Sequence, residues 1–234
     1  MTRRIRLLSG GAAQGLVAQL KERFHAGSGC VVDGTFGAVG AMRDRLLGGE
    51  PCDLLILTQT LIDQLTADGH VVPGSLRPLG AVKTGVAVKA GESLPDLATP
   101  AVLKDALLAA REIYFPDPVK ATAGIHFMKV LRSLGIEKEV ASRLRPFPNG
   151  ATAMSEMSKA SGAGALGCTQ VTEILYTPGV QLVGLLPPEF ELATVYTAAV
   201  SRDAREPAAA TEFIDLLSSE ESAGLRLAGG FESP

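Results

Sequence analysis

Short apolar runs alternate with amphipathic segments along almost the whole chain. The clearest amphipathic segment carries Phe127, Val130, Leu131 and Leu134 at i, i+3, i+4 and i+7, which is the spacing of one helix face. The apolar runs are typical of buried strands and lie at Ile5–Leu8, Cys30–Asp33, Asp53–Leu57, Thr84–Val88, Glu112–Phe115, Ala165–Thr169, Val180–Leu185 and Val195–Val200. This alternation predicts an α/β fold in which a mostly parallel sheet is flanked by helices.

The other predicted helices are identified by the apolar residues of one face. They are the segments with Leu16, Val17, Leu20 and Phe24; with Val39, Met42 and Leu46; with Leu61, Ile62 and Leu65; Ala151–Lys159; and the segment with Ala210, Phe213, Ile214 and Leu217.

Proline- and glycine-rich stretches near residues 73–80 and 186–191 interrupt this pattern twice. We interpret them as two crossover connections between two α/β lobes, the first formed by residues 1–80 and 190–234 and the second by residues 81–189. Two lobes joined in this way are expected to leave a ligand-binding cleft between them.

Clusters of small residues follow several of the apolar runs, usually just before a helical pattern begins. The first N–H groups of a helix lack intrahelical partners, and small side chains let an anion approach them closely. Five clusters have this character: Ser9–Ala13, Phe36–Gly40, Lys120–Gly124, Asn149–Thr152 and Gly162–Cys168. The pattern predicts a receptor for a small oxyanion or carboxylate.

Composition excludes several other classes of protein. The 234 residues carry a formal net charge of -3, which gives no basic surface for nucleic acid, and no run of about 18 apolar residues predicts a membrane span. Three cysteines without a CxxC pair and three histidines without HxH or HExxH spacing predict neither a disulfide framework nor a metal site. No cofactor is expected.

The first residues carry positive charge but no apolar segment of the kind found in signal peptides. We therefore expect a cytoplasmic protein, or a periplasmic one if a signal peptide has been removed. A transporter partner is not expected, because a transport receptor would have no role in the cytoplasm.

Short motifs are spread over nearly the whole chain: Leu8–Ala13, Thr35–Gly40, Glu50–Leu57, Asp117-Pro118 followed by Ala123-Gly124, Gly164–Leu166, Phe213-Ile214 with Ser218–Glu220, and Gly230-Phe231. Together they resemble the motifs of the periplasmic molybdate-binding proteins of ABC transporters. The resemblance implies the type II periplasmic-binding-protein fold, with two α/β lobes that close on a ligand.

The chain departs from this family at the residues that would bind molybdate. The family usually has serine hydroxyls in the first two anion loops and a tyrosine in the late strand. Here Gly10 or Gly11 stands at the first position, Gly37-Ala38 at the second, and Gly167 near the third. Each hydrogen bond to a charged ligand contributes roughly 1.5–3 kcal/mol, so tight molybdate binding is not expected. The wider pocket favours a larger organic anion, such as a di- or tricarboxylate.

The candidate ligand-binding residues come from the five clusters. They are Ser9, Gly10, Gly11, Ala12, Phe36, Gly37, Ala38, Lys120, Thr122, Ala123, Asn149, Gly150, Ala151, Thr152, Gly167 and Cys168. Each has a structural alternative: Lys120 as a solvated surface cation, Thr122 and Asn149 as helix caps, Cys168 as a small core residue. The match Gly162-x-Gly164-x-x-Gly167 precedes a strand, whereas the dinucleotide fingerprint follows one, so no nucleotide site is predicted.

Two functions remain open. The first is a binding protein for a small anion. The second is a cytoplasmic isomerase of an unsaturated carboxylate, because aconitate isomerases share the fold that the resemblance implies. In that enzyme Lys120 or His126 would move the proton, although a histidine on a helix face is more often structural. A sensor domain is the third alternative, but the chain shows no DNA-binding or signalling extension.

Overall fold

The computed structural model describes residues 3–233, and the chain divides into two units. Unit 1 contains the chain up to Val82 and from Thr194 onward, whereas unit 2 runs continuously from Lys83 to Ala193. The chain leaves unit 1 within strand β4 (Arg77–Lys89) and returns at the start of strand β9 (Ala193–Val200). Unit 1 is therefore assembled from two segments that lie far apart in the sequence.

The sheet of unit 1 has the strand order β2-β1-β3-β9. Its strands are β1 (Arg4–Gly10), β2 (Val31–Gly37), β3 (Leu54–Thr58) and β9. Strand β1 pairs in parallel with β2 and β3, while β9 runs antiparallel to β3. All five residues of β3 are buried, as expected for a central strand covered on both faces.

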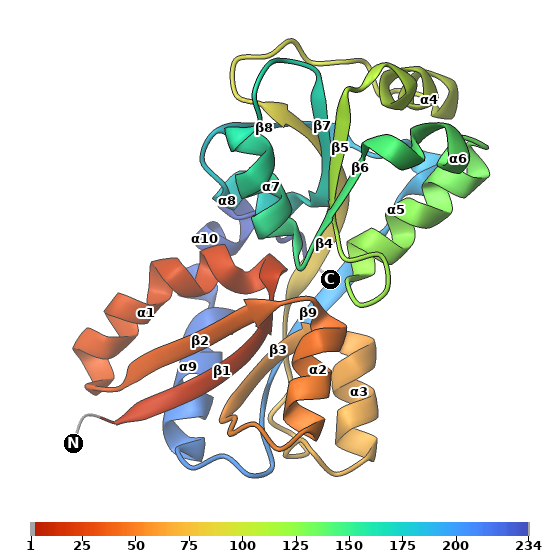
Figure 1. The fold of residues 1–234 in the computed structure, drawn as a ribbon. Helices are drawn as coiled ribbons and strands as arrows, with labels where there is room; N and C mark the ends of the chain where they lie inside the picture. The colour runs from red at the N-terminus through yellow and green to blue at the C-terminus, as the bar shows by residue number, and fades with distance from the viewer. Residues whose placement is uncertain (1–2, 234) are drawn as a thin grey trace. The chain divides into compact units, whose positions relative to one another are not determined.

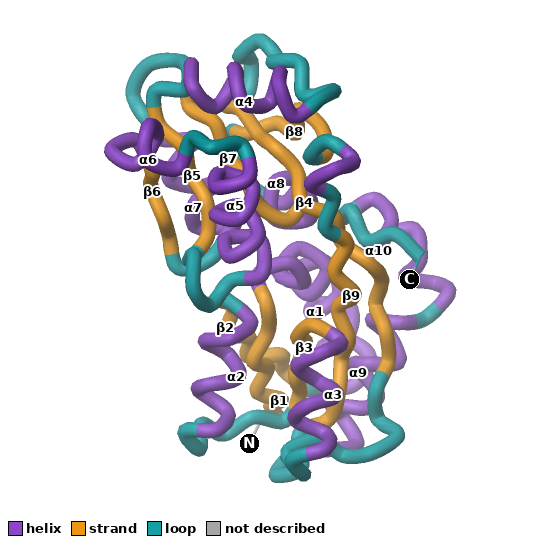
Figure 2. The backbone as a smooth tube through the Cα atoms, turned by 90° about the vertical axis from the view of Figure 1, so that its right-hand side faces the viewer, coloured by secondary structure: helices purple, strands orange, loops and turns teal. Residues whose placement is uncertain are grey.

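Helices cover both faces of this sheet. Helices α1 (Gln14–Ser28) and α9 (Pro207–Ser218) lie together on one face, where the Phe24 and Phe213 rings are 4.8 Å apart. Helices α2 (Val39–Leu47) and α3 (Gln59–Ala67) lie on the other face (Figures 1 and 2). A short 3-10 turn, η1 (Gly11–Ala13), precedes α1, and η4 (Glu220–Ser222) and α10 (Ala223–Ala228) follow α9.

Asp53 joins three parts of unit 1 just before β3 begins. Its side chain is 1% exposed and accepts hydrogen bonds from the backbone N–H groups of Arg6 (2.7 Å), Arg205 (2.6 Å) and Glu206 (3.1 Å). Arg6 lies in β1, whereas Arg205 and Glu206 lead into α9. One buried side chain thus connects the N-terminal strand to the returning C-terminal segment.

The main sheet of unit 2 has the strand order β4-β7-β5-β6, and β8 also pairs with β4. Its remaining strands are β5 (Glu112–Pro116), β6 (Leu144–Phe147), β7 (Ala165–Gln170) and β8 (Val180–Leu185). Strand β5 pairs in parallel with β6 and β7, while β4 runs antiparallel to β7 and β8.

Alternate residues of the central strands fill two separate cores. Ile113 and Phe115 pack with helices α4 (Pro100–Ala109) and α5 (Thr122–Ser133), whereas Tyr114 packs with α7 (Gly150–Lys159) and α8 (Val171–Tyr176). This period of two is the side-chain alternation of a β-strand. The short elements α6 (Glu137–Val140), η2 (Ala141–Arg143) and η3 (Pro188–Phe190) complete the unit.

The predicted α/β class with mostly parallel pairing is confirmed, but several elements differ from the sequence analysis. Strand β2 continues to Gly37 and β4 begins at Arg77, so both are longer than expected. Helices α4, α6, α8 and α10 and strand β6 were not predicted. Within residues 3–233, no helix is long and apolar enough to cross a membrane.

Candidate functional site

The first two small-residue clusters lie side by side in unit 1. The parallel register of β1 and β2 pairs Ser9 with Phe36 and Gly10 with Gly37, so both strands end at the same edge of the sheet. The turn η1 begins directly after Gly10, and α2 begins after Ala38. The predicted residues Ser9–Ala12 and Phe36–Ala38 are therefore brought together by the sheet.

Neither of these helix starts has a side-chain cap. Gly10 precedes η1 and Ala38 precedes α2, and neither residue has a side chain that accepts from the first N–H groups. The neighbouring helix α3 differs, because the Thr58 hydroxyl accepts from the Leu61 N–H at 3.4 Å. The uncapped N–H groups, together with the positive end of each helix dipole, can receive an anion.

The Ser9 hydroxyl does not add to these donors. Ser9 is fully buried, and its hydroxyl donates to the Gly10 carbonyl at 2.9 Å. The Ser9 side chain is therefore not one of the donors of this cluster. A Cβ at Gly10 would lie 2.8 Å from Val39 Cγ1 and 3.0 Å from Tyr196 Cε1, so a larger residue has no room there. Tyr196, which the sequence analysis missed, thus lies beside the first cluster.

In unit 2, the start of α5 is held by a tight turn after β5. Asp117 Oδ1 accepts from the backbone N–H groups of Val119 (2.7 Å) and Lys120 (2.9 Å). A Cβ at Gly124 would overlap the carbonyl oxygens of Pro116 and Asp117, so the first turn of α5 packs directly on the end of β5. This contact explains why the cluster Lys120–Gly124 ends in glycine.

The start of α5 also lacks a side-chain cap. Ala121 precedes the helix and accepts from the Ile125 N–H through its own carbonyl, but its side chain has no oxygen. Among the described residues, the half-buried Thr122 hydroxyl has no hydrogen-bond partner. Thr122 and the backbone N–H groups of the first turn are therefore the donors that α5 can present to a ligand. Ala123 is buried in that turn.

The two predicted proton-transfer residues lie in different surroundings. Lys120 is exposed at the end of the turn before α5. The His126 ring donates through Nε2 to the Phe190 carbonyl at 2.8 Å, which ties α5 to the turn η3. This contact favours the structural reading of His126 over the catalytic one, because one ring nitrogen already has a fixed partner.

The fourth cluster lies at the start of α7, where side chains of the protein itself already accept from the backbone N–H groups. Asn149 Oδ1 accepts from the Thr152 N–H at 2.8 Å, and the Glu173 side chain accepts from the N–H groups of Gly150 (3.2 Å) and Ala151. The first three N–H groups of α7 therefore have acceptors inside unit 2. This finding corrects the expectation that Asn149, Gly150, Ala151 and Thr152 offer their backbone N–H groups to a ligand.

Glu173 lies where two helices begin. Besides the α7 donors, its side chain accepts from the Thr169 hydroxyl at 2.5 Å and from the Gln170 N–H. A Cβ at Gly150 would overlap both the Thr169 hydroxyl and the Glu173 carboxyl group, so only glycine fits there. Burial raises the pKa of Glu173 above its ordinary value of 4.5, although these hydrogen bonds oppose the shift.

The sequence analysis missed Glu173, yet part of its role has a sequence signal. Gln170 precedes α8, and Glu173 is the third helical residue, which is the spacing of a capping box. The contacts with Gly150 and Ala151 have no such signal, because they depend on how α7 and α8 pack.

Gly167 and Cys168 lie inside β7, in agreement with the predicted strand Ala165–Thr169. Gly167 lies within β7, where a Cβ would be 2.5 Å from Met154 Cε. Cys168 is 1% exposed in the core beneath α5, and burial raises the pKa of its thiol. Both residues are therefore packing residues, and β7 ends at Gln170, one residue beyond the predicted end.

Comparison with known proteins agrees with this architecture. Residues 5–232 match the family model of the bacterial extracellular solute-binding proteins. An aconitate isomerase from Pseudomonas sp. is 26% identical over 225 residues, which cover 93% of this chain and 83% of that protein.

Solved structures with low sequence identity share the fold. The periplasmic molybdate-binding protein of Azotobacter vinelandii is 20% identical, with a TM-score of 0.81 over 98% of this chain and 99% of that one. The sulfate-binding protein SubI from Mycobacterium tuberculosis H37Rv is also 20% identical, with a TM-score of 0.74 over 99% and 87% of the two chains.

These findings confirm the predicted periplasmic-binding-protein fold. The family description refers to extracellular proteins and lends no support to the expected cytoplasmic location, which stays a prediction. The match extends over nearly all described residues and includes both units. The chain belongs to the family of bacterial extracellular solute-binding proteins.

Proposed function

We propose that this protein binds a small organic anion that carries carboxylate groups. The observation that carries the proposal is the absence of side-chain caps at the helix starts after β1, β2 and β5. Family membership supports the binding of a small solute. In unit 1 the proposed donors are the first N–H groups of η1 and α2, which the register of β1 and β2 brings together. Unit 2 by itself offers the first N–H groups of α5 and the Thr122 hydroxyl.

The donor set favours a carboxylate over a compact metal oxyanion. Gly10, Gly37 and Ala38 provide no hydroxyl groups, and the Ser9 hydroxyl donates to a carbonyl instead. A tetrahedral oxyanion in this position would lack several hydrogen bonds, each of roughly 1.5–3 kcal/mol. A planar carboxylate group needs fewer donors, and paired N–H groups match its two oxygens. The similarity to an aconitate isomerase is a second, independent support for a carboxylate ligand.

The proposal is tested by measuring thermal unfolding with citrate, tricarballylate, cis-aconitate, trans-aconitate, molybdate and sulfate. A ligand present at 100 times its Kd stabilises the folded state by about 2.7 kcal/mol. We expect at least one carboxylate to raise the melting temperature at millimolar concentration, and molybdate and sulfate to have smaller effects. Stabilisation by the inorganic anions alone would contradict the proposal.

The ligand affinity of the variant Ala38→Asp tests whether the ligand binds at the uncapped start of α2. A carboxylate at this position accepts from the α2 N–H groups, so we expect a stability gain of about 1 kcal/mol and at least tenfold weaker ligand binding. Ala38→Asn makes the same cap without a charge and should act in the same direction. Glu206→Asp is the matched control, because α9 also begins without a side-chain cap but has no proposed ligand contact.

A second candidate function is the isomerisation of an unsaturated carboxylate. The aconitate isomerase similarity over 93% of this chain favours it. Backbone N–H groups would hold the carboxylates and stabilise an enolate-like intermediate, and Lys120 would transfer the proton. Proton NMR of cis- and trans-aconitate with the protein in D2O would then show interconversion with deuterium uptake, both lost in Lys120→Met. A ligand that binds without exchange would leave binding alone as the function.

A further inference from the structure

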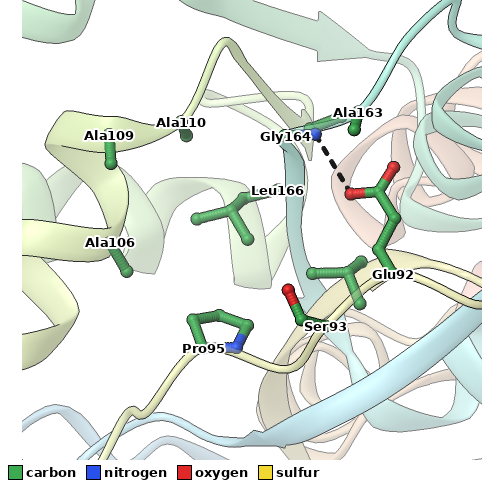
Figure 3. Close-up of a pocket in the computed structure, with 11 residues that line it drawn as sticks. Glu92, Ser93, Pro95, Ala106, Ala109, Ala110, Ala163, Gly164 and Leu166 are labelled. Carbon is green, nitrogen blue, oxygen red and sulfur yellow. Dashed lines mark hydrogen bonds between the residues drawn. The ribbon is translucent and has the colours of Figure 1, made fainter.

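A cavity of about 460 Å³ lies in unit 2, apart from the helix starts described above. Its walls include Ala106, Ala109 and Ala110 at the end of α4, Leu166 of β7, and Pro95 and Glu92 after β4. Figure 3 shows the three alanines on one side, Glu92 on the other, and Leu166 between them. The volume falls within the range of small-molecule binding pockets.

The cavity exists because one face of α4 carries only methyl groups. Leu103 and Leu107 of this helix are buried in the core of unit 2. Ala106, Ala109 and Ala110 follow at i, i+3 and i+4, and their side chains are too short to fill the space above Leu166. The wall is thus apolar and consists of small side chains.

Hydrogen bonds fix the opposite rim. Glu92 Oε2 accepts from the Gly164 N–H at 3.0 Å, and Gln181 Nε2 donates to the Glu92 carbonyl at 2.8 Å. Lys89 Nζ donates to the carbonyls of Ala160 (2.5 Å) and Gly162 (3.2 Å). These contacts hold the loop before β7 and the turn after β4 in place, so the rim is preorganised for a ligand.

The cavity and the proposed anion donors lie at opposite ends of the parallel strands. Gly164–Leu166 stand at the amino end of β7, whereas α5, which carries the proposed donors of unit 2, begins after the carboxyl end of β5. Among the described residues that line the cavity, Glu92 is the only charged one. A carboxylate ligand would meet a negative charge here, so this cavity does not suit the anion of the proposed function.

We propose that this cavity is a second ligand site for an uncharged, mainly apolar small molecule that carries one hydrogen-bond donor. The alanine wall and Leu166 receive the apolar body, and Glu92 at the rim accepts from the donor. A cationic ligand is disfavoured, because Lys89 and the Arg111 guanidinium already donate to carbonyls of the loop whose Gly164 N–H donates to Glu92. A phenol or a small alcohol has the required chemistry.

The experiment is a titration of the isotope-labelled protein with p-cresol, followed by NMR. We expect amide shifts in α4, β7 and residues 92–94. The Kd should be at least tenfold lower for p-cresol than for 4-methylbenzoate, which has the same ring but a negative charge. Toluene, which lacks the donor, should bind several-fold more weakly than p-cresol. Equal affinities for p-cresol and toluene would overturn the role of Glu92.

Variants of α4 assign the binding to the cavity. Ala106→Phe fills it and should weaken p-cresol binding at least tenfold. Ala109→Phe, at an exposed position of the mouth, is the second variant should Ala106→Phe fail to fold. Ala101→Phe, on an exposed part of the same helix outside the cavity, is the matched control. Unchanged affinity in both cavity variants, or shifts confined to other parts of the chain, would overturn the proposal. Carboxylate binding is expected to persist in all three.

Discussion

Replacing Glu173 with alanine is expected to lower the free energy of unfolding of unit 2 by about 4 kcal/mol. The change removes the acceptor for the N–H groups of Gly150, Ala151 and Gln170 and for the Thr169 hydroxyl. These donors lie where water has little access, since Glu173 itself is only 5% exposed. Buried donors left without acceptors carry their full desolvation cost, and the missing side chain also leaves a cavity.

Hydrogen exchange of the α7 and α8 amides in the full chain measures this loss within unit 2. Glu156→Ala is the matched control, because Glu156 lies on α7 in an exposed pair with Lys159 and such pairs contribute little. Its effect should stay below about 0.5 kcal/mol. Equal effects of the two substitutions would show that the N–H groups of α7 and α8 do not depend on Glu173.

The contribution of Glu173 to the stability of unit 2 is expected to decrease as the pH rises. Because burial raises the pKa of Glu173, the folded state binds this proton more tightly than the unfolded state. The corresponding stabilisation is therefore fully present below pH 4.5 and is lost as the pH rises through the folded-state pKa. Glu173→Gln cannot titrate, so the stability of the wild-type protein should fall relative to this variant as the pH rises. The opposite slope would mean that the hydrogen bonds outweigh burial.

Replacing Asp53 with alanine is expected to destabilise unit 1 by roughly 3–5 kcal/mol. The variant leaves the N–H groups of Arg6, Arg205 and Glu206 without their acceptor, at a position that is 1% exposed. It also detaches the turn that leads into α9 from the start of β3. Urea unfolding of the full chain, combined with hydrogen exchange of β1 and α9, measures the loss and assigns it to unit 1.

Two controls separate the hydrogen bonds of Asp53 from its charge and from general effects of the substitution. Asp53→Asn keeps one carbonyl oxygen and should retain part of the stability. Asp33→Ala removes an exposed aspartate that pairs with Arg4 on the surface of the same unit, and should change stability by less than about 0.5 kcal/mol. A loss of similar size in Asp33→Ala and Asp53→Ala would contradict the anchoring role of Asp53.

The fold class could be predicted because the strongest signals were local. The predicted strand Asp53–Leu57 corresponds to β3. The helical spacing of Phe127, Val130 and Leu131 correctly predicted the buried face of α5. Helix α4 was missed because the proline-rich stretch around residues 95–100 obscured its start. Thr99 and Pro100 are nevertheless helix-start residues, and the Thr99 hydroxyl accepts from the Val102 N–H at 3.4 Å.

The candidate site was less predictable because it depends on contacts between distant segments. Small-residue clusters identified helix starts, but the pairing of Gly10 with Gly37 is a property of the register between β1 and β2. The same limit applies to α7: only the packing of α8 against it shows that Glu173 already takes the N–H groups of Gly150 and Ala151. Gly167 was correctly predicted in a strand, but only the packed structure shows that Met154 needs a glycine there, because a Cβ would lie 2.5 Å from Met154 Cε.

The two-segment construction of unit 1 has a consequence for the order in which the chain is made. Unit 2 is continuous, so every residue of its cores is synthesised before the ribosome reaches Thr194. Unit 1 cannot be completed until then, because its last parts are synthesised after unit 2. These parts are β9, which pairs with β3, and Arg205 and Glu206, which donate to Asp53. The usual order, in which N-terminal parts fold first during translation, is therefore reversed here: the nascent chain holds β3 and Asp53 without their partners while unit 2 folds.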